Sequence, residues 1–242
     1  MKLLIIGSGA LAEQACRLAE ASALVEEYEL WNGVGAMPAA DRVLPATKDE
    51  RLLALAGPDA LFDPDAWALA SSRLGADAFL QEHGFPVPAY FPGGSEPYIV
   101  KPDRGGDGKG IWVTEDFCEV GGAVNAGFVA QEELIGPVWS VAVTGANGGY
   151  TAHTPAKLTF DDRRRTGAAC ESFPAGAEAL DKLATDIARA MGLRGILEVE
   201  AIWCHNTWFV TDLNARLPLY TPDAVLDVAG INLLDELIRS FG

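Results

Sequence analysis

Residues 99–111 have the sequence Ile99-Val100-Lys101-Pro102-Asp103-Arg104-Gly105-Gly106-Asp107-Gly108-Lys109-Gly110-Ile111. The apolar start of this stretch, together with Tyr98, predicts a strand that delivers Lys101 at its end. The loop that follows contains four glycines. Glycine admits positive φ and brings backbone N–H groups close to an anion, and a lysine at the mouth of the loop adds a full positive charge. The stretch therefore suits a triphosphate, although by itself the loop is equally compatible with a flexible glycine-rich hairpin.

The loop does not have the Walker A pattern. Lys109 is followed by Gly110 rather than Ser or Thr, and Asp103 stands where that pattern has its first glycine. A strand over 110–114, rather than a helix, is predicted to follow. A bound triphosphate would therefore need cations or a metal ion from elsewhere in the chain.

Polar residues alternate in two later stretches, 195–201 (Gly-Ile-Leu-Glu-Val-Glu-Ala) and 210–216 (Val-Thr-Asp-Leu-Asn-Ala-Arg). Alternation along a strand places Glu198 and Glu200 on one face. A hairpin that turns at residues 205–206 would bring Glu200 opposite Asp212. Solvated acidic residues on an exposed sheet are the simpler alternative, but the Ile, Leu and Val residues around them argue against it.

Oxygen side chains that converge from paired strands suit a hard cation. Glu200, Asp212 and Asn214 offer Mg²⁺ the few carboxylates that it prefers beside phosphate oxygens, and Mn²⁺ is an alternative ion for such a donor set. Arg216, two residues beyond Asn214, could reach a phosphate or a carboxylate in the same site. The sequence thus predicts a divalent metal site in addition to the glycine loop.

With these motifs in this order, the chain resembles the ATP-grasp superfamily over about residues 71–240. Residues 98–110 look like its phosphate-covering loop, residues 131–136 (Gln-Glu-Glu-Leu-Ile-Gly) look like the interdomain hinge that meets adenine, and residues 212–216 look like its acidic-x-Asn-x-Arg signature. Within the superfamily, the motifs are most similar to the pyrrolysine-pathway ligases, which join lysine to 3-methylornithine. The first domain of this chain is shorter than in that group.

The resemblance implies roles for individual residues. Lys101 and Arg216 would be the catalytic cations, and the metal ligands would be Glu200, Asp212 and Asn214. The residues expected to contact ATP are Arg73, Lys101, Gly105, Gly106, Asp107, Gly108, Lys109, Gln131, Glu132, Glu133 and Leu134. Many members carry a ribose-binding Glu two residues after the hinge glycine. Val138 stands there in this chain. Either Glu133, which we favour, or Glu132 is expected to contact the ribose instead, or ribose recognition is weaker than in those members.

The expected fold is α/β, with an α+β C-terminal part: an ATP-grasp fold with a small Rossmann-like N-terminal domain. We expect that domain at 1–70, a central subdomain with the glycine-rich lid at 71–135, and a C-terminal subdomain with the metal site at 136–242. The opening strand, glycine turn and helix (2–6, 7–10 and 11–21) are typical of a βαβ unit.

The remaining elements are predicted from apolar periodicity and from Gly and Pro boundaries. Further strands are expected at 28–31, 59–62, 128–132, 139–144, 150–159, 196–203 and 207–213. Further helices are expected at 48–56, 65–70, 71–83, 175–191 and 231–241.

The expected function is an ATP- and Mg²⁺-dependent carboxylate–amine ligase that acts on amino acids through an acyl phosphate. Two alternatives stay open at this point. One is a non-catalytic nucleotide-binding protein, and the other is an NAD(P)-dependent Rossmann oxidoreductase that uses the turn at residues 7–12. That turn and the mixed-charge residues 161–165 are candidate borders of the amino-acid pocket, with Glu171 and Ser140 as weaker candidates.

The net charge of the chain limits the kinds of molecule that it is expected to bind. Eighteen basic residues against 34 acidic residues give a net charge of −16, which disfavours nucleic acid and anionic membranes. The expected partner is a small amino-acid or carboxylate substrate, with a homodimer as the expected assembly if the chain self-associates. No stretch has the pattern of a signal peptide or a membrane span, so a cytoplasmic location is expected.

Overall fold

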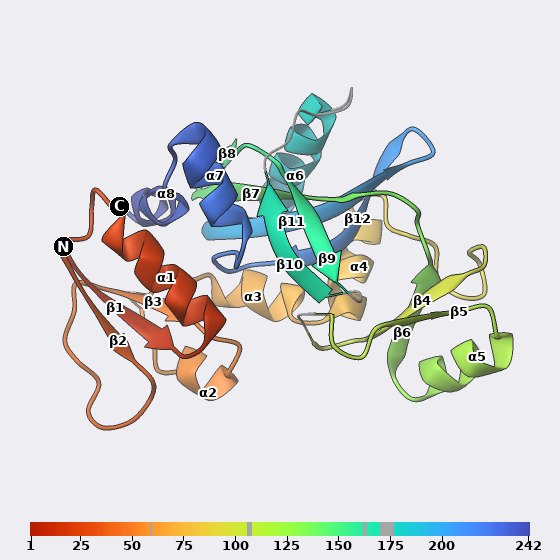
Figure 1. Ribbon diagram of the computed structural model, residues 1–242, viewed down its shortest axis with the longest axis horizontal. Coiled ribbons are helices and arrows are strands. Elements are labelled where there is room, and N and C mark those ends of the chain that lie inside the picture. Colours follow the sequence, from red (N-terminus) through yellow and green to blue (C-terminus); the bar gives the residue numbers. More distant parts are fainter. Residues whose placement is uncertain (59, 106–107, 162–163, 170–176) are drawn as a thin grey trace.

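The computed structural model describes residues 1–58, 60–105, 108–161, 164–169 and 177–242. The described strands form three separate sheets. In Figure 1 the N-terminal sheet lies at the left, the largest sheet in the middle and the smallest at the right. None of the helices in these ranges is long and apolar enough to cross a membrane.

The N-terminal sheet has β1 (Lys2–Gly7) at its centre, parallel to β2 (Glu27–Trp31) and to β3 (Arg42–Ala46). Helix α1 (Ala10–Glu20) starts after the glycine turn, as expected, and buries one face in the core. The strand expected at 59–62 is wrong, because Ala60 makes only an isolated bridge to Val43. The third strand is β3, which Pro45 obscures in the sequence. An edge strand such as β3 tolerates that proline.

The smallest sheet places β4 (Tyr98–Pro102) between β5 (Trp112–Thr114) and β6 (Phe128–Glu132), antiparallel to both. Helix α5 (Phe117–Asn125) covers one face of this sheet through Val120 and Ala123. The sequence analysis missed α5 because the pair Gly121-Gly122 lowers its helix propensity. The Asp116 side chain accepts hydrogen bonds from two backbone N–H groups of its first turn and so begins the helix.

Within the described residues the largest sheet contains six strands: β7 (Val138–Ala146), β8 (Gly149–Ala152), β9 (Ala156–Asp161), β10 (Arg164–Ala169), β11 (Gly195–Cys204) and β12 (Thr207–Asn214). The hairpin of β11 and β12 turns at His205 and Asn206, which have φ of 48° and 61°. This confirms the predicted turn. The single strand expected at 150–159 is wrong: β8 and β9 are separate, since Pro155 between them has no N–H for the ladder.

Six further helices are described. They are α2 (Glu50–Leu53), α3 (Pro64–Ala70), α4 (Arg73–Glu82), α6 (Ala177–Met191), α7 (Thr221–Ala229) and α8 (Leu233–Ser240). Helix α2 is shorter than the helix expected at 48–56, and α7 was not predicted. One core joins α4 and α6 to the largest sheet, through Leu80 and Ile187.

A second core joins α1 and the N-terminal sheet to α8 and the largest sheet, through Leu18 and Leu234. Residues from the first and last parts of the expected three-part division therefore share one core. The division itself stays a prediction.

Candidate functional site

A cleft opens between the sheets and consists of three adjoining cavities. The lid cavity, about 530 Å³, is lined by residues that include Lys48, Trp67, Gly105, Lys109 and Ala215. The turn cavity, about 440 Å³, is lined by residues that include Ser8, Thr47, Gly108, Phe160 and Tyr220. The hinge cavity, about 290 Å³, is lined by residues that include Lys101, Glu133, Leu134, Val138 and Ile202. Arg73 and Asp212 line all three, which makes them parts of one cleft.

The charge of this cleft differs from that of the whole chain. The basic residues that line it are Lys48, Arg73, Lys101, Arg104, Lys109 and Arg216, and the acidic residues are Glu50, Asp103, Glu132, Glu133, Glu200 and Asp212. The formal charges of these residues balance, whereas the chain as a whole carries −16. An anionic ligand is therefore repelled less in the cleft than elsewhere on the molecule.

Lys101 and Asp212 both line the hinge cavity, so the two motifs that the sequence analysis linked lie at one site. Lys101 is 7% exposed and donates from Nζ to Gln131 Oε1 at 3.2 Å. Burial is the main cause that lowers the pKa of Lys101, and the nearby Asp212 carboxylate opposes this effect. An anion that binds beside Lys101 would favour its charged form.

Arg73, at the first position of α4, crosses between the sheets. Its Nη1 donates to the Pro102 carbonyl at 2.6 Å, and its Nη2 lies 3.6 Å from Asp212 Oδ2. Arg73 Nε is buried and has no hydrogen-bond partner among the described residues. A buried donor without a partner is costly, so the Arg73 guanidinium is held by its Pro102 and Asp212 contacts at some expense in stability.

The start of the glycine loop is attached to α4. Asp103 Oδ1 accepts from Ser72 Oγ and from the Leu74 backbone N–H, each at 2.9 Å. Gly108 and Gly110 have φ of 68° and 72°, a conformation that glycine adopts at little cost. Gly105, Gly108 and Lys109 line the cleft, and their contact with ATP stays a prediction. Gly106 and Asp107 lie outside the described residues.

The predicted hinge residues differ in how they meet the hinge cavity. Glu133 and Leu134 line the hinge cavity. Glu132 also lines it, but its carboxylate accepts from the Ala89 N–H at 3.0 Å and from Ser95 Oγ at 3.4 Å. The Gln131 side chain is 2% exposed and contacts Lys101 and Asp77. Gln131, predicted to contact ATP, does not line any of the three cavities.

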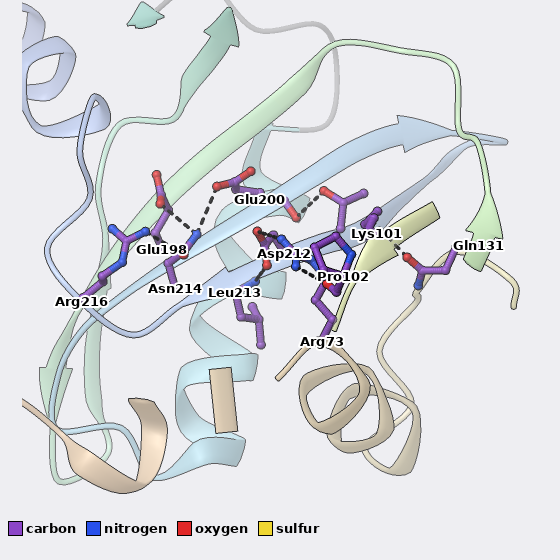
Figure 2. A network of polar contacts seen from close by, with 11 residues as sticks. Arg73, Lys101, Pro102, Gln131, Glu198, Glu200, Asp212, Leu213, Asn214 and Arg216 are labelled. Carbon is purple, nitrogen blue, oxygen red and sulfur yellow. Dashed lines mark hydrogen bonds and ion pairs between the residues drawn. The ribbon is translucent and has the colours of Figure 1, made fainter. Parts of the chain in front are cut away.

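The predicted carboxylate hairpin forms with the expected pairing. Glu200 lies opposite Asp212, and Glu198 lies opposite Asn214. Asn214 Nδ2 donates to Glu198 Oε2 and to Glu200 Oε1, both at 3.2 Å. Arg216 Nη2 donates to Asn214 Oδ1 at 3.0 Å. In Figure 2, Glu198, Asn214 and Arg216 lie on one side of Asp212, and Lys101 and Gln131 lie on the other.

The donor set of the hairpin fits a hard divalent cation. It supplies two carboxylates, Glu200 and Asp212, and Glu200 is only 6% exposed. The Asn214 amide oxygen would be a third ligand only after the amide turns over, because here its Nδ2 donates to Glu200 and its Oδ1 accepts from Arg216. In the described part of the chain no three His, Cys, Asp or Glu side chains cluster as a metal site. The candidate site therefore consists of two carboxylates and one amide, which leaves coordination positions for phosphate oxygens and water.

Glu198, which the sequence analysis placed on the same strand face as Glu200, is fully buried. Its Oε1 accepts from Ser140 Oγ and from Thr221 Oγ1, each at 2.9 Å. Its Oε2 accepts from Asn214 Nδ2. Ser140, a weak candidate for the substrate pocket, thus serves this buried network. Glu198 fixes the direction in which the Asn214 amide points.

Replacement of Glu198 by Leu is expected to lower the free energy of unfolding by about 3 kcal/mol or more, because buried donors lose their acceptor. Urea denaturation monitored by circular dichroism measures this. Glu198→Gln retains one acceptor oxygen and should lose about half as much. Equal stability of the Leu variant and the wild-type protein would contradict the role of Glu198 as a buried acceptor.

Packing adds residues to the site that the sequence analysis missed. Lys48 and Thr47 follow β3 and reach the turn cavity, and Phe160 on β9 lines both the turn and hinge cavities. Ser8 lines the turn cavity, as expected for the glycine turn. Of the other pocket candidates, Asp162, Arg163 and Glu171 lie outside the described residues.

The fold and this cleft define a class of protein: a three-sheet α/β chain with a glycine-rich loop and a carboxylate hairpin on two sides of one cavity. The ATP-grasp domain family matches residues 70–218, which is more than half of the chain. The chain belongs to the ATP-grasp family. This confirms the fold class and the family resemblance that the motifs indicated.

Individual proteins with similar sequences or structures give a more specific comparison than the family match. The 3-methyl-D-ornithine–L-lysine ligase of Methanosarcina acetivorans is 29% identical over 182 residues, which cover 75% of this chain and 49% of that protein. The chain thus spans about half the length of the curated relatives that it matches. Among solved structures, D-alanine–D-alanine ligase from Bacillus anthracis has a TM-score of 0.74 at 16% identity, over 99% of this chain and 97% of its own.

A second structural neighbour is N5-carboxyaminoimidazole synthetase from Staphylococcus aureus, determined in complex with ADP. Its TM-score is 0.76 at 17% identity, over 99% of this chain and 76% of its own. At these identities the two structures support the fold alone.

Proposed function

We propose that this protein is an ATP- and Mg²⁺-dependent ligase that joins a carboxylate to an amine through an acyl phosphate. The observation that carries the proposal is the shared hinge cavity of Lys101 and Asp212, with Arg73 between them. Family membership and the ligase names of the curated relatives support it. Because the match begins at residue 70 and includes the lid and the hairpin, it favours the ligase over the NAD(P)-dependent oxidoreductase.

Lys101 and Arg73 would hold the phosphates of ATP. Both side chains are largely buried and face the cleft from β4 and α4. In a site that excludes water, such cations stabilise the negative charge that gathers on a transferring phosphoryl group. The glycine loop would close over the triphosphate and limit hydrolysis of the activated carboxylate.

Glu200, Asp212 and Asn214 would hold Mg²⁺. The ion, when bound, neutralises charge on the phosphate oxygens. The three protein ligands lie on neighbouring strands of a hairpin, so the ladder hydrogen bonds keep their spacing. Arg216, which holds the Asn214 amide oxygen and lines the lid and turn cavities, would contact the transferred phosphoryl group or the carboxylate.

The turn cavity would take the amino-acid substrate. Lys48 and Arg216 line it together with Tyr220 and Phe160. This combination suits a carboxylate that is bound next to an aliphatic or aromatic surface. The cavity adjoins Asp212 and Gly108, so a carboxylate held there would lie beside the proposed phosphate site.

Release of ADP from ATP tests the proposal directly. A panel of amino acids, singly and in pairs, is incubated with the protein, ATP and MgCl₂ or MnCl₂. The ligase predicts that one pair raises ADP release well above either member alone, with an amide product by mass spectrometry. If ATP binds but no pair stimulates ADP release, the second candidate, a non-catalytic nucleotide-binding protein, is favoured. The observation on its side is Val138, which stands where many family members carry the ribose-binding Glu.

The ribose contact can be tested separately. Glu133 lines the hinge cavity beside Leu134. Glu133→Gln is therefore expected to weaken ATP binding about tenfold, the typical loss for a charged hydrogen bond. Affinity for 2′,3′-dideoxy-ATP should change less than about twofold. Isothermal titration calorimetry with both nucleotides measures the difference.

An equal loss for both nucleotides would show that Glu133 does not contact the ribose hydroxyls. Val138→Glu, introduced into the Glu133→Gln variant, supplies the carboxylate at the position where other family members carry it. It is expected to restore part of the affinity for ATP and none for the dideoxy nucleotide.

A further inference from the structure

A series of hydrogen-bonded polar side chains, all buried except the half-buried Tyr90, runs from Tyr90 to Lys101. Tyr90 Oη donates to Asp77 Oδ2 at 2.5 Å, and Gln131 Nε2 donates to the same oxygen at 2.9 Å. Gln131 Oε1 in turn accepts from Lys101 Nζ at 3.2 Å. Asp77 is 8% exposed, and Gln131 and Lys101 are buried as well. None of the roles assigned above uses Asp77 or Tyr90.

The direction of the Gln131 amide is the central feature of this series of hydrogen bonds. An amide has one accepting end and one donating end, and a lysine ammonium can only donate. Because Asp77 Oδ2 accepts, Gln131 turns its Nε2 toward Asp77 and its Oε1 toward Lys101. If the amide were reversed, two donors would face each other at Lys101. Asp77 thus selects the orientation in which Gln131 can accept from Lys101.

Helix α4 connects this series of hydrogen bonds to the rest of the cleft. Arg73 and Asp77 are four residues apart on α4 and therefore lie on one face of the helix. Arg73 contacts Pro102 on β4 and Asp212 on β12, and Asp77 contacts Gln131 on β6. One face of one helix thus positions groups on both sheets that border the hinge cavity.

Lys101 needs such support because its ammonium is buried. Burial is the main cause that lowers its pKa, and Asp212 and Asp77 oppose this effect, while Arg73 adds to it. A buried ammonium without a fixed acceptor is costly. It would be expected to adopt several orientations or to lose its proton, and either change would weaken its contact with a phosphate.

We propose that Asp77 is a positioning residue for Lys101, acting through the Gln131 amide, so that the ammonium is already directed at the hinge cavity before ATP binds. This inference rests on the proposed function, which gives Lys101 a phosphate to bind. It does not require any contact between Asp77 and the nucleotide, and Asp77 does not line the three cavities described above.

The test is a double-mutant cycle on ATP affinity, measured by isothermal titration calorimetry of the full chain. Asp77→Ala is expected to weaken ATP binding about tenfold, which corresponds to about 1.4 kcal/mol. Asp77→Asn can place its amide oxygen where Oδ2 lies and still accept from Tyr90 and Gln131, so its affinity should stay within about threefold of wild type. In a Lys101→Met background, Asp77→Ala should cause no further loss, since the residue on which it acts is gone.

Two further variants keep the test independent of folding. Gln131→Met removes the link without removing Asp77 and is expected to match Asp77→Ala. Leu80→Ala, a buried α4 residue outside the cavities, should lower the melting temperature and leave ATP affinity within about twofold. This control would show that a loss of stability alone does not weaken ATP binding.

The outcomes separate this inference from the proposed function. Additive losses for Asp77→Ala and Lys101→Met would overturn the positioning role, because a purely structural effect does not depend on Lys101. An Asp77→Asn loss as large as that of Asp77→Ala would also overturn it. If the wild-type protein does not bind ATP at all, the proposed function fails instead.

Discussion

Asp212→Asn is expected to slow substrate-dependent ADP release by about 10³-fold, the range seen when a group that stabilises transition-state charge is removed. Asn keeps the size of Asp but lacks the negative charge that a divalent cation requires. Asp212 lines all three cavities and lies 3.6 Å from the Arg73 guanidinium. Its charge therefore acts at the centre of the cleft. A coupled assay for ADP, run over a range of MgCl₂ concentrations, measures the effect.

Three comparisons make this result interpretable. Asp65→Asn, an exposed aspartate on α3 outside the cleft, should release ADP at the wild-type rate. Glu200→Gln should match Asp212→Asn, because both remove a carboxylate from the same hairpin. Circular dichroism should show that all variants retain the fold. Near-wild-type ADP release by either hairpin variant would mean that the metal site lies elsewhere.

Lys101→Met is expected to weaken ATP binding by about 100-fold, which corresponds to about 2.7 kcal/mol. Met has a similar length and no charge, so it fills the same space on β4 but offers no donor to a phosphate. Because Lys101 donates to the buried Gln131 amide oxygen and lies near Asp77 and Asp212, its removal leaves buried acceptors without their cation, which is costly. The variant should thus lower the melting temperature somewhat but stay folded while it loses affinity. Calorimetric titration with ATP and a thermal melt provide the two measurements.

The control for this variant is Lys182→Met, in which an exposed lysine on α6 is replaced. It should bind ATP as the wild-type protein does. Unchanged ATP affinity in Lys101→Met would remove Lys101 from the phosphate site and leave Arg73 as the main cation of the hinge cavity.

Local sequence patterns are sufficient to predict two elements that line the cleft, the glycine loop and the carboxylate hairpin. The glycine loop was recognised from its four glycines, and the carboxylate hairpin from alternation on either side of residues 205–206. Both signals are short-range: a left-handed turn needs residues that tolerate positive φ, and alternation needs only the pleat of a strand. The observed pairing of Glu200 with Asp212 confirms the second argument.

The sequence did not predict two elements whose own residues disfavour their secondary structure. The sequence of β3 contains Pro45 and that of α5 contains Gly121-Gly122. Both elements form because packing compensates: β3 pairs with the buried β1, and α5 covers the apolar face of β4 and β6. Propensity is a weak prior that tertiary contacts override.

The sequence alone thus determined the family, the two motifs and the residues that face the cleft from one hairpin and one loop. Only the tertiary structure decided how α4 lies, and with it the contacts of Arg73 with Asp212 and of Asp77 with Gln131. It also turned the Gln131 side chain away from the hinge cavity and toward Lys101, and it brought Lys48 and Phe160 to the turn cavity. These relations join residues far apart in the chain. Their geometry depends on how helices and sheets pack, which no local pattern encodes.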